Sequence, residues 1–256
     1  MKLIDLKPTT TKQPPRIFIT GTHGTGKTTL VSGAPSPLIF DLEDGSGQIE
    51  ITRYPWQTDG SAPTFENIKS ALTSLESEDH NFRTLIIDSV DTLESIIWNH
   101  TCDVESKRGT RHTSIEGFGY GKGYVLALGY VREFLQRLDR LRRLRSMAIV
   151  LVGHTHIRLF KNPEGDDYDR FVPRLKENAA NAIKEWSDIV GFLKFEEGAG
   201  KGDSDVKSKG FSTGRRILHL ERTAAFDAKC RYDLDPAIEI NGADSWSKLM
   251  PRKSKK

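Results

Sequence analysis

Residues 21–28 are Gly21-Thr22-His23-Gly24-Thr25-Gly26-Lys27-Thr28, which fits the pattern G-x-x-x-x-G-K-[ST]. The apolar run Ile17-Phe18-Ile19 before it predicts a buried strand, and residues 27–31 after it can open a helix. A strand, a glycine-rich loop and a helix in this order are typical of a phosphate-binding loop. The alternative is a glycine-rich turn with a chance lysine, and the flanking elements favour the phosphate site.

Each residue type of this loop suits the chemistry of a bound triphosphate. Glycines let the backbone approach a phosphate group and turn its N–H groups inward. Lys27 is expected to reach the β- and γ-phosphates and to take part in catalysis, and the Thr28 hydroxyl is expected to ligate Mg²⁺. The full set of residues expected to bind the nucleotide is Gly21, Thr22, His23, Gly24, Thr25, Gly26, Lys27, Thr28 and Thr29.

Two further apolar runs, within residues 37–45 and 84–89, predict strands that end in carboxylates. The carboxyl ends of parallel strands face the ligand crevice of an α/β sheet, so these acids are expected near the phosphates. Glu43 is the predicted general base that activates water, and a solvated acidic turn is the alternative. Asp88 is the predicted Mg²⁺ ligand. Asp91 is a lesser candidate that could equally cap the helix that follows.

A third apolar run, residues 148–152, predicts another buried strand and is followed by Gly153-His154-Thr155-His156. A polar side chain at such a strand end can bond to the γ-phosphate and report hydrolysis to the loop beyond it. His154 is therefore the predicted sensor and a predicted catalytic residue. Two alternatives stay open: a metal site at His154 and His156, which lacks a cysteine or an acid at ligand spacing, and a purely structural His154.

The length and composition of the chain limit the classes of protein to which it can belong. The 256 residues suit one large α/β domain, and 36% hydrophobic with 29% charged residues is typical of a polar globular protein. A net charge of only +3 permits nucleic-acid binding without arguing for it. Two distant cysteines form no disulfide or zinc pattern, which favours a reducing cytoplasm. No apolar run approaches the roughly 20 residues of a membrane span, so no membrane association is expected.

Two segments combine basic, aromatic and glycine residues in a way that suits single-stranded DNA. Residues 107–124 include Gly117-Phe118-Gly119-Tyr120-Gly121-Lys122-Gly123-Tyr124 and are expected to form a pliable loop. The alternative is an ordinary loop with Phe118 or Tyr120 packed beneath it. Residues 158–181 are expected to form a long, irregular, moving contact. The DNA-binding candidates are Lys107, Arg108, Arg111, Tyr120, Lys122, Lys161, Arg170 and Arg174.

The remaining chain sets the expected domain boundaries. The expected parts are a flexible arm over residues 1–15, a core domain over residues 16–240 and a basic tail over residues 241–256. Residues 189–195 and 217–221 predict paired antiparallel strands, with residues 196–215 as a disordered hairpin tip. The apolar spacing predicts helices over residues 64–75, 125–147 and 179–186. Basic side chains after the hairpin are either surface charges or fingers that reach a neighbouring subunit's γ-phosphate, and they are Arg222, Lys229 and Arg231.

The order of these motifs resembles the RecA-like core of P-loop ATPases. Residues 39–43 resemble the RecA strand that ends in its catalytic glutamate, and residues 85–90 resemble its Walker B strand. Residues 150–154 resemble the strand that ends in its sensor glutamine, which is a histidine in this chain. The resemblance implies an α/β, RecA-like P-loop NTPase core, with a mostly parallel central sheet flanked by helices and a C-terminal antiparallel hairpin.

More closely, the chain resembles the bacteriophage AAA-domain ATP-binding proteins, which are regarded as single-strand annealing recombinases with a RecA core. The family's features appear at residues 117–124, 152–154 and 188–192, and the resemblance covers residues 16–234. It implies that residues 107–124 and 158–181 match the two DNA-binding loops of RecA. It also implies a homo-oligomer, as a ring or filament, with ATP between subunits in the host cytoplasm. A single-strand-binding protein is a candidate partner.

The expected activity is Mg²⁺-dependent ATP hydrolysis coupled to single-stranded DNA binding and to annealing or strand exchange. ATP is favoured over GTP because the chain has no Asn-Lys-x-Asp motif. One rival is a P-loop kinase of a small metabolite, for which residues 158–181 would be the lid. The other is a non-enzymatic switch, in which ATP binding alone drives association with a partner.

Overall fold

The structure is a computed structural model, and it describes residues 13–56, 62–107, 109, 111–199 and 210–250. Its elements are β1 (Arg16–Gly21), α1 (Lys27–Ser32), β2 (Pro37–Asp41), β3 (Thr52–Arg53), α2 (Phe65–Ser77), β4 (Thr84–Asp88), α3 (Val90–Lys107), η2 (Ile115–Phe118), α4 (Lys122–Arg145), β5 (Ala148–Phe160), β6 (Tyr168–Pro173), α5 (Glu177–Trp186), β7 (Ile189–Ala199), β8 (Gly210–His219), β9 (Lys229–Cys230), β10 (Ala237–Ile240) and η3 (Ala243–Leu249). Within these described ranges, no helix has both the length and the apolar content needed to span a membrane.

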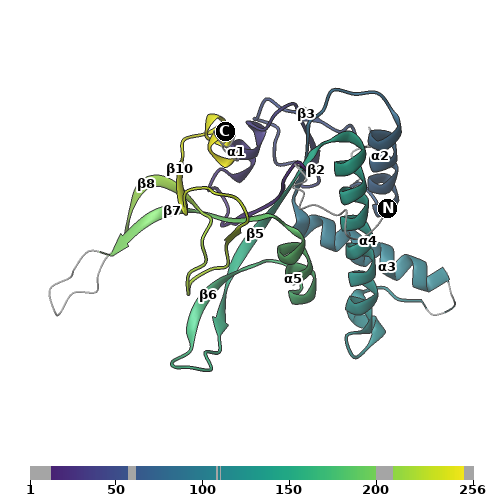
Figure 1. Cartoon of the computed structure of the whole chain (residues 1–256). Coiled ribbons are helices and arrows are strands. Elements are labelled where there is room, and N and C mark those ends of the chain that lie inside the picture. The colour runs from purple at the N-terminus through teal and green to yellow at the C-terminus, as the bar shows by residue number, and fades with distance from the viewer. Residues whose placement is uncertain (1–12, 57–61, 108, 110, 200–209, 251–256) are drawn as a thin grey trace, which may run out of the picture.

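Ten strands join in one sheet, in the order β10-β8-β7-β1-β5-β4-β2-β3, with β6 added to β5 and β9 added to β7. The strands from β3 to β7 in that order run parallel, whereas β6, β8, β9 and β10 pair antiparallel. Helices flank the sheet, and two hairpins extend beyond it (Figure 1). The predicted fold class is therefore confirmed: an α/β fold with a mostly parallel sheet flanked by helices and antiparallel C-terminal strands.

Side chains that alternate along the strands divide the core between the two faces of the sheet. On one face, Phe18 of β1 and Ile87 of β4 pack with the buried side chains of α2, α3, α4 and α5. On the other face, Ile17 and Ile19 of β1 pack with α1 and with the buried Trp246 of η3. The phosphate loop, which follows β1, therefore leads into a helix on this second face.

The register of the sheet brings the sequence motifs together at the carboxyl ends of the parallel strands. Gly21 at the end of β1 lies opposite His154 of β5. Asp88 at the end of β4 lies opposite Val152 of β5 on one side and Asp41 of β2 on the other. Strand β5 thus separates the strand that carries the phosphate loop from the strand that carries Asp88.

The segment after His154 is a β-hairpin, so the prediction of a long irregular loop over residues 158–181 is wrong. Strand β5 continues to Phe160 and pairs antiparallel with β6, and α5 follows. The turn between them contains Asn162 and Gly165, and the Asn162 side chain accepts a hydrogen bond from the Glu164 N–H. β-branched and aromatic residues on both arms favour strands, and the Asn-Pro-Glu-Gly sequence supplies the turn rather than an irregular coil.

The C-terminal part is also more regular than expected. Strands β7 and β8 extend to Ala199 and from Gly210, so only residues 200–209 of the expected tip lie outside the described part of the chain. Residues 243–249 of the expected basic tail form η3 and pack on α1, because Trp246 and Leu249 are buried there. Residues 1–12 and 251–256 lie outside the described residues. Of the expected arm, Pro15 accepts a backbone hydrogen bond from Ile149.

Candidate nucleotide site

The phosphate loop has the predicted flanks, β1 before it and α1 after it. Gly21 must be glycine because a Cβ there would lie 2.2 Å from the Leu193 carbonyl oxygen of β7. Gly26, which precedes α1, has a φ of 85°, a value that side-chain-bearing residues rarely adopt. The Thr25 hydroxyl donates to the Thr22 carbonyl at 3.0 Å and holds the loop closed. The backbone is therefore shaped as a phosphate loop requires.

Lys27 lies under this loop, and its side chain is buried. Its ammonium group donates to the carbonyl oxygens of Gly21 at 3.1 Å and Thr22 at 2.9 Å. Burial lowers the pKa of Lys27. These carbonyls hold the charge at the mouth of the loop, so a phosphate oxygen can replace them without moving the lysine far.

The Thr28 hydroxyl donates to Asp88 Oδ2 at 2.6 Å, which joins the start of α1 to the end of β4. Asp88 is buried, and the loss of solvation raises its pKa. A hydroxyl and a carboxylate side by side are hard oxygen ligands of the kind that Mg²⁺ prefers. The two predicted metal ligands therefore fit that ion, and a cation between them would offset the cost of burying Asp88.

Glu43 lies beside these groups because the loop after β2 is held by Asp41. The Asp41 carboxylate accepts from the backbone N–H groups of Glu43, Gly45 and Ser46. Three side chains donate to the Glu43 carboxylate: His154 Nε2 at 3.3 Å, Thr92 Oγ1 at 3.0 Å, and Ser89 Oγ. The bond from His154, followed by those from the hydroxyls, lowers the pKa of Glu43 to about 2. The carboxylate is ionised at neutral pH, as a base requires.

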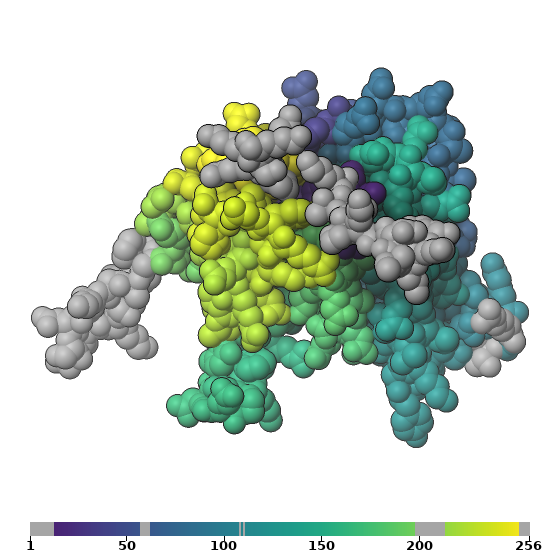
Figure 2. Space-filling view, viewed as in Figure 1, coloured from purple at the N-terminus to yellow at the C-terminus, as the bar shows by residue number. Residues whose placement is uncertain are grey.

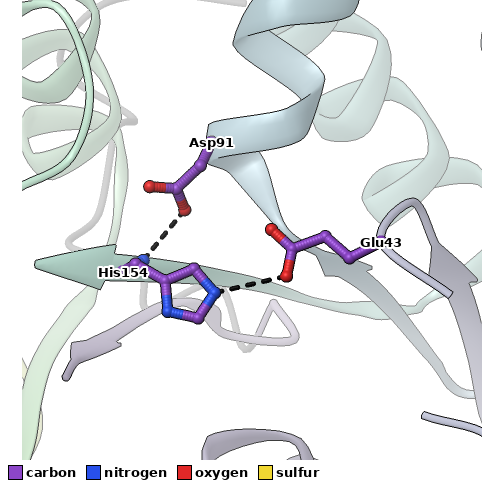
Figure 3. Close-up of side chains that lie close together, drawn as sticks. All are labelled: Glu43, Asp91 and His154. Atoms are coloured by element: carbon purple, nitrogen blue, oxygen red, sulfur yellow. Dashed lines mark hydrogen bonds and ion pairs between the residues drawn. The ribbon is translucent and has the colours of Figure 1, made fainter. Parts of the chain in front are cut away.

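His154 lies between Lys27 and Glu43. Figure 3 shows its contacts with Glu43 and Asp91. Its Nδ1 lies 3.3 Å from Lys27 Nζ and its Nε2 lies 3.3 Å from Glu43 Oε2. Because an ammonium group only donates, Nδ1 is the acceptor and Nε2 carries the proton that is donated to Glu43. The His23 ring stacks on it, with ring centroids 3.9 Å apart. The structure therefore places His154 between the phosphate loop and the predicted base.

Asp91 takes a part that the sequence analysis did not assign to it. It lies in the first turn of α3, and its Oδ2 accepts from the backbone N–H of His154 at 2.9 Å, so it is not the cap of the helix. Burial raises its pKa. The ligand atoms of Glu43, Asp91 and His154 lie within 4.8 Å of one another. The acids missing from the His154–His156 pattern are supplied by distant segments, while His156 is not in this group.

A cleft of about 590 Å³ opens beside these catalytic candidates. It runs from His23, Glu43 and His154 past the first two turns of α3 to Tyr124 and to residues 174–176. The Lys176 ammonium lies 4.0 Å from the centre of the Tyr124 ring. Both segments that were proposed to bind DNA therefore meet in a cleft next to the candidate base.

Glu94 forms part of the same cleft and was not singled out in the sequence. Its two carboxylate oxygens accept from the Lys176 backbone N–H at 3.0 and 3.1 Å, which joins α3 to the start of α5. Burial raises the pKa of Glu94 to about 7. An acid in the second turn of α3 gives no local signal of this contact, because its partner lies 82 residues away.

The DNA-binding candidates divide between exposed and buried positions. Those that are exposed are Lys107, Arg111, Tyr120, Lys122, Lys161 and Arg174. Arg108 lies outside the described residues. Arg170 is buried and its Nη2 is ion-paired with Asp227 at 2.5 Å, so it is less accessible to DNA than the exposed candidates. Phe118 stacks on His112, with centroids 3.7 Å apart, whereas Tyr120 is fully exposed.

The three finger candidates each have a partner within the chain. The Arg231 guanidinium lies 3.0 Å from Asp188, the Lys229 ammonium donates to the Lys184 carbonyl, and Arg222 lies 4.0 Å from Asp227. Strand β9, which carries Lys229, pairs with the first residues of β7. Lys229 and Arg231 therefore lie near the amino end of β7, whereas the phosphate loop follows the carboxyl end of the parallel strand β1.

A family model described as "AAA domain" matches residues 13–232. No curated protein matches the sequence. Among solved structures, the crystal structure of the RadB recombinase is similar, with a TM-score of 0.46 and 13% sequence identity over 90% of this chain and 89% of that chain. A similarity at that score says nothing of ligands or activity.

Proposed function

The chain belongs to the AAA-domain family, and we propose that it is a Mg²⁺-dependent ATPase that couples nucleotide turnover to the binding of single-stranded DNA. One observation carries the ATPase part: five polar side chains meet at the carboxyl ends of neighbouring strands. They are Lys27, Thr28, Glu43, Asp88 and His154, and hydrogen-bond distances join Thr28 to Asp88 and Lys27 to Glu43 through His154.

Each of these residues takes a separate part in the proposed reaction. Lys27 exchanges its carbonyl partners for phosphate oxygens, and Thr28 and Asp88 hold Mg²⁺, which would neutralise charge on the phosphate chain. Glu43 accepts a proton from the attacking water. A carboxylate with a pKa of about 2 is a weak base, and His154 is the largest cause of that low pKa. A His154 that turns toward the γ-phosphate would therefore make Glu43 a stronger base.

The DNA part of the proposal rests on the cleft and on the surface around it. The β5–β6 hairpin and the start of α4 project from the same side of the molecule, with a recess between them (Figure 2). Tyr120 and Lys122 at the start of α4 are exposed, as is Lys161 at the hairpin. An exposed ring with cations on both sides of a recess suits stacking on bases and contact with phosphates.

The finer part of the proposal follows from the sequence resemblance alone. On that basis the protein anneals or exchanges single strands in bacteriophage recombination, in the host cytoplasm. It acts as a homo-oligomer, and a single-strand-binding protein is a candidate partner.

The test is ATP turnover with and without a single-stranded oligonucleotide, across a salt series. We expect the wild-type protein to hydrolyse ATP, and we expect DNA to stimulate it less as the salt concentration rises. Lys27→Ala is the control, because it removes the phosphate contact and should show no turnover under any condition. Turnover without any stimulation would remove the DNA part and keep the ATPase part.

A small-molecule kinase is the second candidate, and the cleft of about 590 Å³ beside Glu43 favours it. Its walls carry carboxylates from α3 and cations from Arg174 and Lys176, which suit a polar acceptor. If the protein is a kinase, one phosphorylated product forms for each ATP consumed when the acceptor is added. Product that is only inorganic phosphate excludes it.

A further inference from the structure

Arg216 of β8 lies against the phosphate loop, although 190 residues of sequence separate it from Gly26. A Cβ placed on Gly26 would lie 2.5 Å from Arg216 Nη1 and 3.6 Å from its Cζ. The guanidinium group therefore occupies the space directly beside the backbone of Gly26. Gly26 is the last residue before Lys27 and Thr28, so this cation borders the proposed phosphate site.

The sheet explains how Arg216 reaches this place. Gly21 at the end of β1 lies opposite Leu193 of β7, and Arg216 lies opposite Phe195 two residues further along β7. Side chains alternate along β8, so Arg216 shares its face with Leu218, which packs in the core layer of α1. That face is the one from which the phosphate loop enters α1.

The partners of Arg216 distinguish it from the other basic residues of this region. Its Cζ lies 5.9 Å from the centre of the Phe195 ring. Among the residues that the structure describes, no carboxylate or carbonyl binds its guanidinium group. Its neighbour Arg215 points to the opposite face and pairs with Glu196 at 3.3 Å and Glu239 at 2.9 Å.

We propose that Arg216 binds the phosphate chain of the nucleotide from within the same subunit, an inference that rests on the proposed nucleotide site. The planar guanidinium fork matches pairs of phosphate oxygens and provides several donors in fixed directions. Lys27 and Arg216 place two cations around the loop, and Arg216 has no described anion to balance it. The antiparallel C-terminal strands thus complete the phosphate site. Arg222, Lys229 and Arg231, by contrast, are held by partners within the chain.

The test compares Arg216→Ala with the matched variant Arg215→Ala. The dissociation constants for ATP, ADP and AMP are measured by titration calorimetry at fixed Mg²⁺ concentration. We expect Arg216→Ala to weaken ATP and ADP binding about tenfold or more, because charge-assisted hydrogen bonds to phosphate are lost. Arg215→Ala should bind like the wild type. Arg216→Lys should recover part of the affinity, since it keeps the charge but not the fork.

Two results separate the failure of this inference from failure of the proposed function. If the wild type binds ATP, Lys27→Ala does not, and Arg216→Ala binds as tightly as the wild type, then Arg216 has no part in phosphate binding. Equal losses of nucleotide affinity in Arg215→Ala and Arg216→Ala would also overturn the inference. They would show that the affinity depends on the total positive charge and not on a contact made by Arg216. If the wild type itself binds no nucleotide, the proposed site fails first. Thermal unfolding without nucleotide shows whether each variant is folded. If Arg216→Ala is not folded, Arg216→Gln is measured in its place.

Discussion

At the scale of single residues, the site depends on a run of polar contacts from Lys27 through His154 to Glu43. Both ring nitrogens of His154 have a hydrogen-bond partner: Nδ1 contacts the lysine and Nε2 contacts the glutamate. The backbone N–H of His154 is fixed by Asp91, so the ring turns about a held main chain. A ligand that moves Lys27 therefore changes what His154 can offer to Glu43.

Glu43→Gln should remove turnover and keep ATP affinity. The amide keeps the shape of the side chain but cannot accept the proton of water, and the loss of a general base typically lowers the rate about 10²–10⁴-fold. The measurement is single-turnover hydrolysis beside equilibrium binding of ATP. Unchanged turnover in the variant would reject Glu43 as the base. Absence of turnover in the wild type, with ATP still bound, would instead favour the non-enzymatic switch.

Glu94→Gln should change how stability depends on pH. The folded-state pKa of about 7 lies above the ordinary carboxyl value, so the folded wild type loses stability as pH rises from about 4.5 to 7. The amide carries no charge and still accepts from Lys176, so the variant should be more stable than the wild type by about 1–3 kcal/mol at pH 8, with a smaller gain at pH 5.

Urea unfolding at the two pH values measures this difference. Glu133→Gln, on the exposed face of α4, is the control and should give the same small change at both pH values. A Glu94→Gln variant whose stability relative to the wild type is the same at pH 5 and pH 8 would show that the buried carboxyl does not titrate in this range.

At the scale of elements, local signals in the sequence identify most of the structure. The strands predicted within residues 37–45 and 84–89 are β2 and β4, which end at Asp41 and Asp88. The helix predicted over residues 64–75 is α2, which begins one residue later because Thr64 forms a capping box with Asn67. The helix predicted from residue 125 begins at Lys122, because Gly121 with a φ of 70° precedes the first turn.

The elements that were missed are strands that form only because a partner strand lies beside them in the fold. The arms of the β5–β6 hairpin contain charged residues between apolar ones, and such a segment becomes a strand only when its neighbour is present. Strand β9 has two residues and exists because β7 lies beside it. Neither case carries a local pattern strong enough to distinguish a strand from a loop.

The start of α4 should contribute to DNA binding if the proposed function is correct. In the double variant Tyr120→Ala with Lys122→Ala, one stacking ring and one cation are lost, so the dissociation constant for single-stranded DNA should rise about tenfold or more. The slope of log affinity against log salt should fall by about 0.7 for the lost cation.

Fluorescence anisotropy with a labelled oligonucleotide measures both quantities. Arg143→Ala, an exposed change at the other end of α4, is the matched control and should bind like the wild type. Equal affinity of the double variant and the control would remove the start of α4 from the DNA site.

At the scale of the whole molecule, the order of the strands determines which side chains meet. The sequence predicts that Gly21, Asp88 and His154 lie at strand ends, but it does not say that β5 lies between β1 and β4. That order puts His154 beside the phosphate loop. The contact of Asp91 with His154 was not predicted, and Glu94 and Arg216 were missed, because their partners are brought near only by the assembled sheet.

Trp246→Ala should destabilise the whole domain, because η3 closes the core layer over α1. Trp246 is 2% exposed and packs among the side chains of that layer. Removal of a buried aromatic side chain typically costs about 3–5 kcal/mol. Urea unfolding should show a single, earlier transition, whereas Trp246→Phe should retain most of the stability. A separate early transition would show that η3 unfolds independently of the sheet.

Strand β5 runs without a break from the buried sheet, through His154, into the outer hairpin. Phe160 at its far end lies six residues beyond His154, which is about 20 Å along an extended strand. If the strand tilted by about 5° at the histidine, its outer end would move by about 2 Å. A displacement at the phosphates that tilted β5 would therefore be amplified at the hairpin tip, because the strand is continuous between the two.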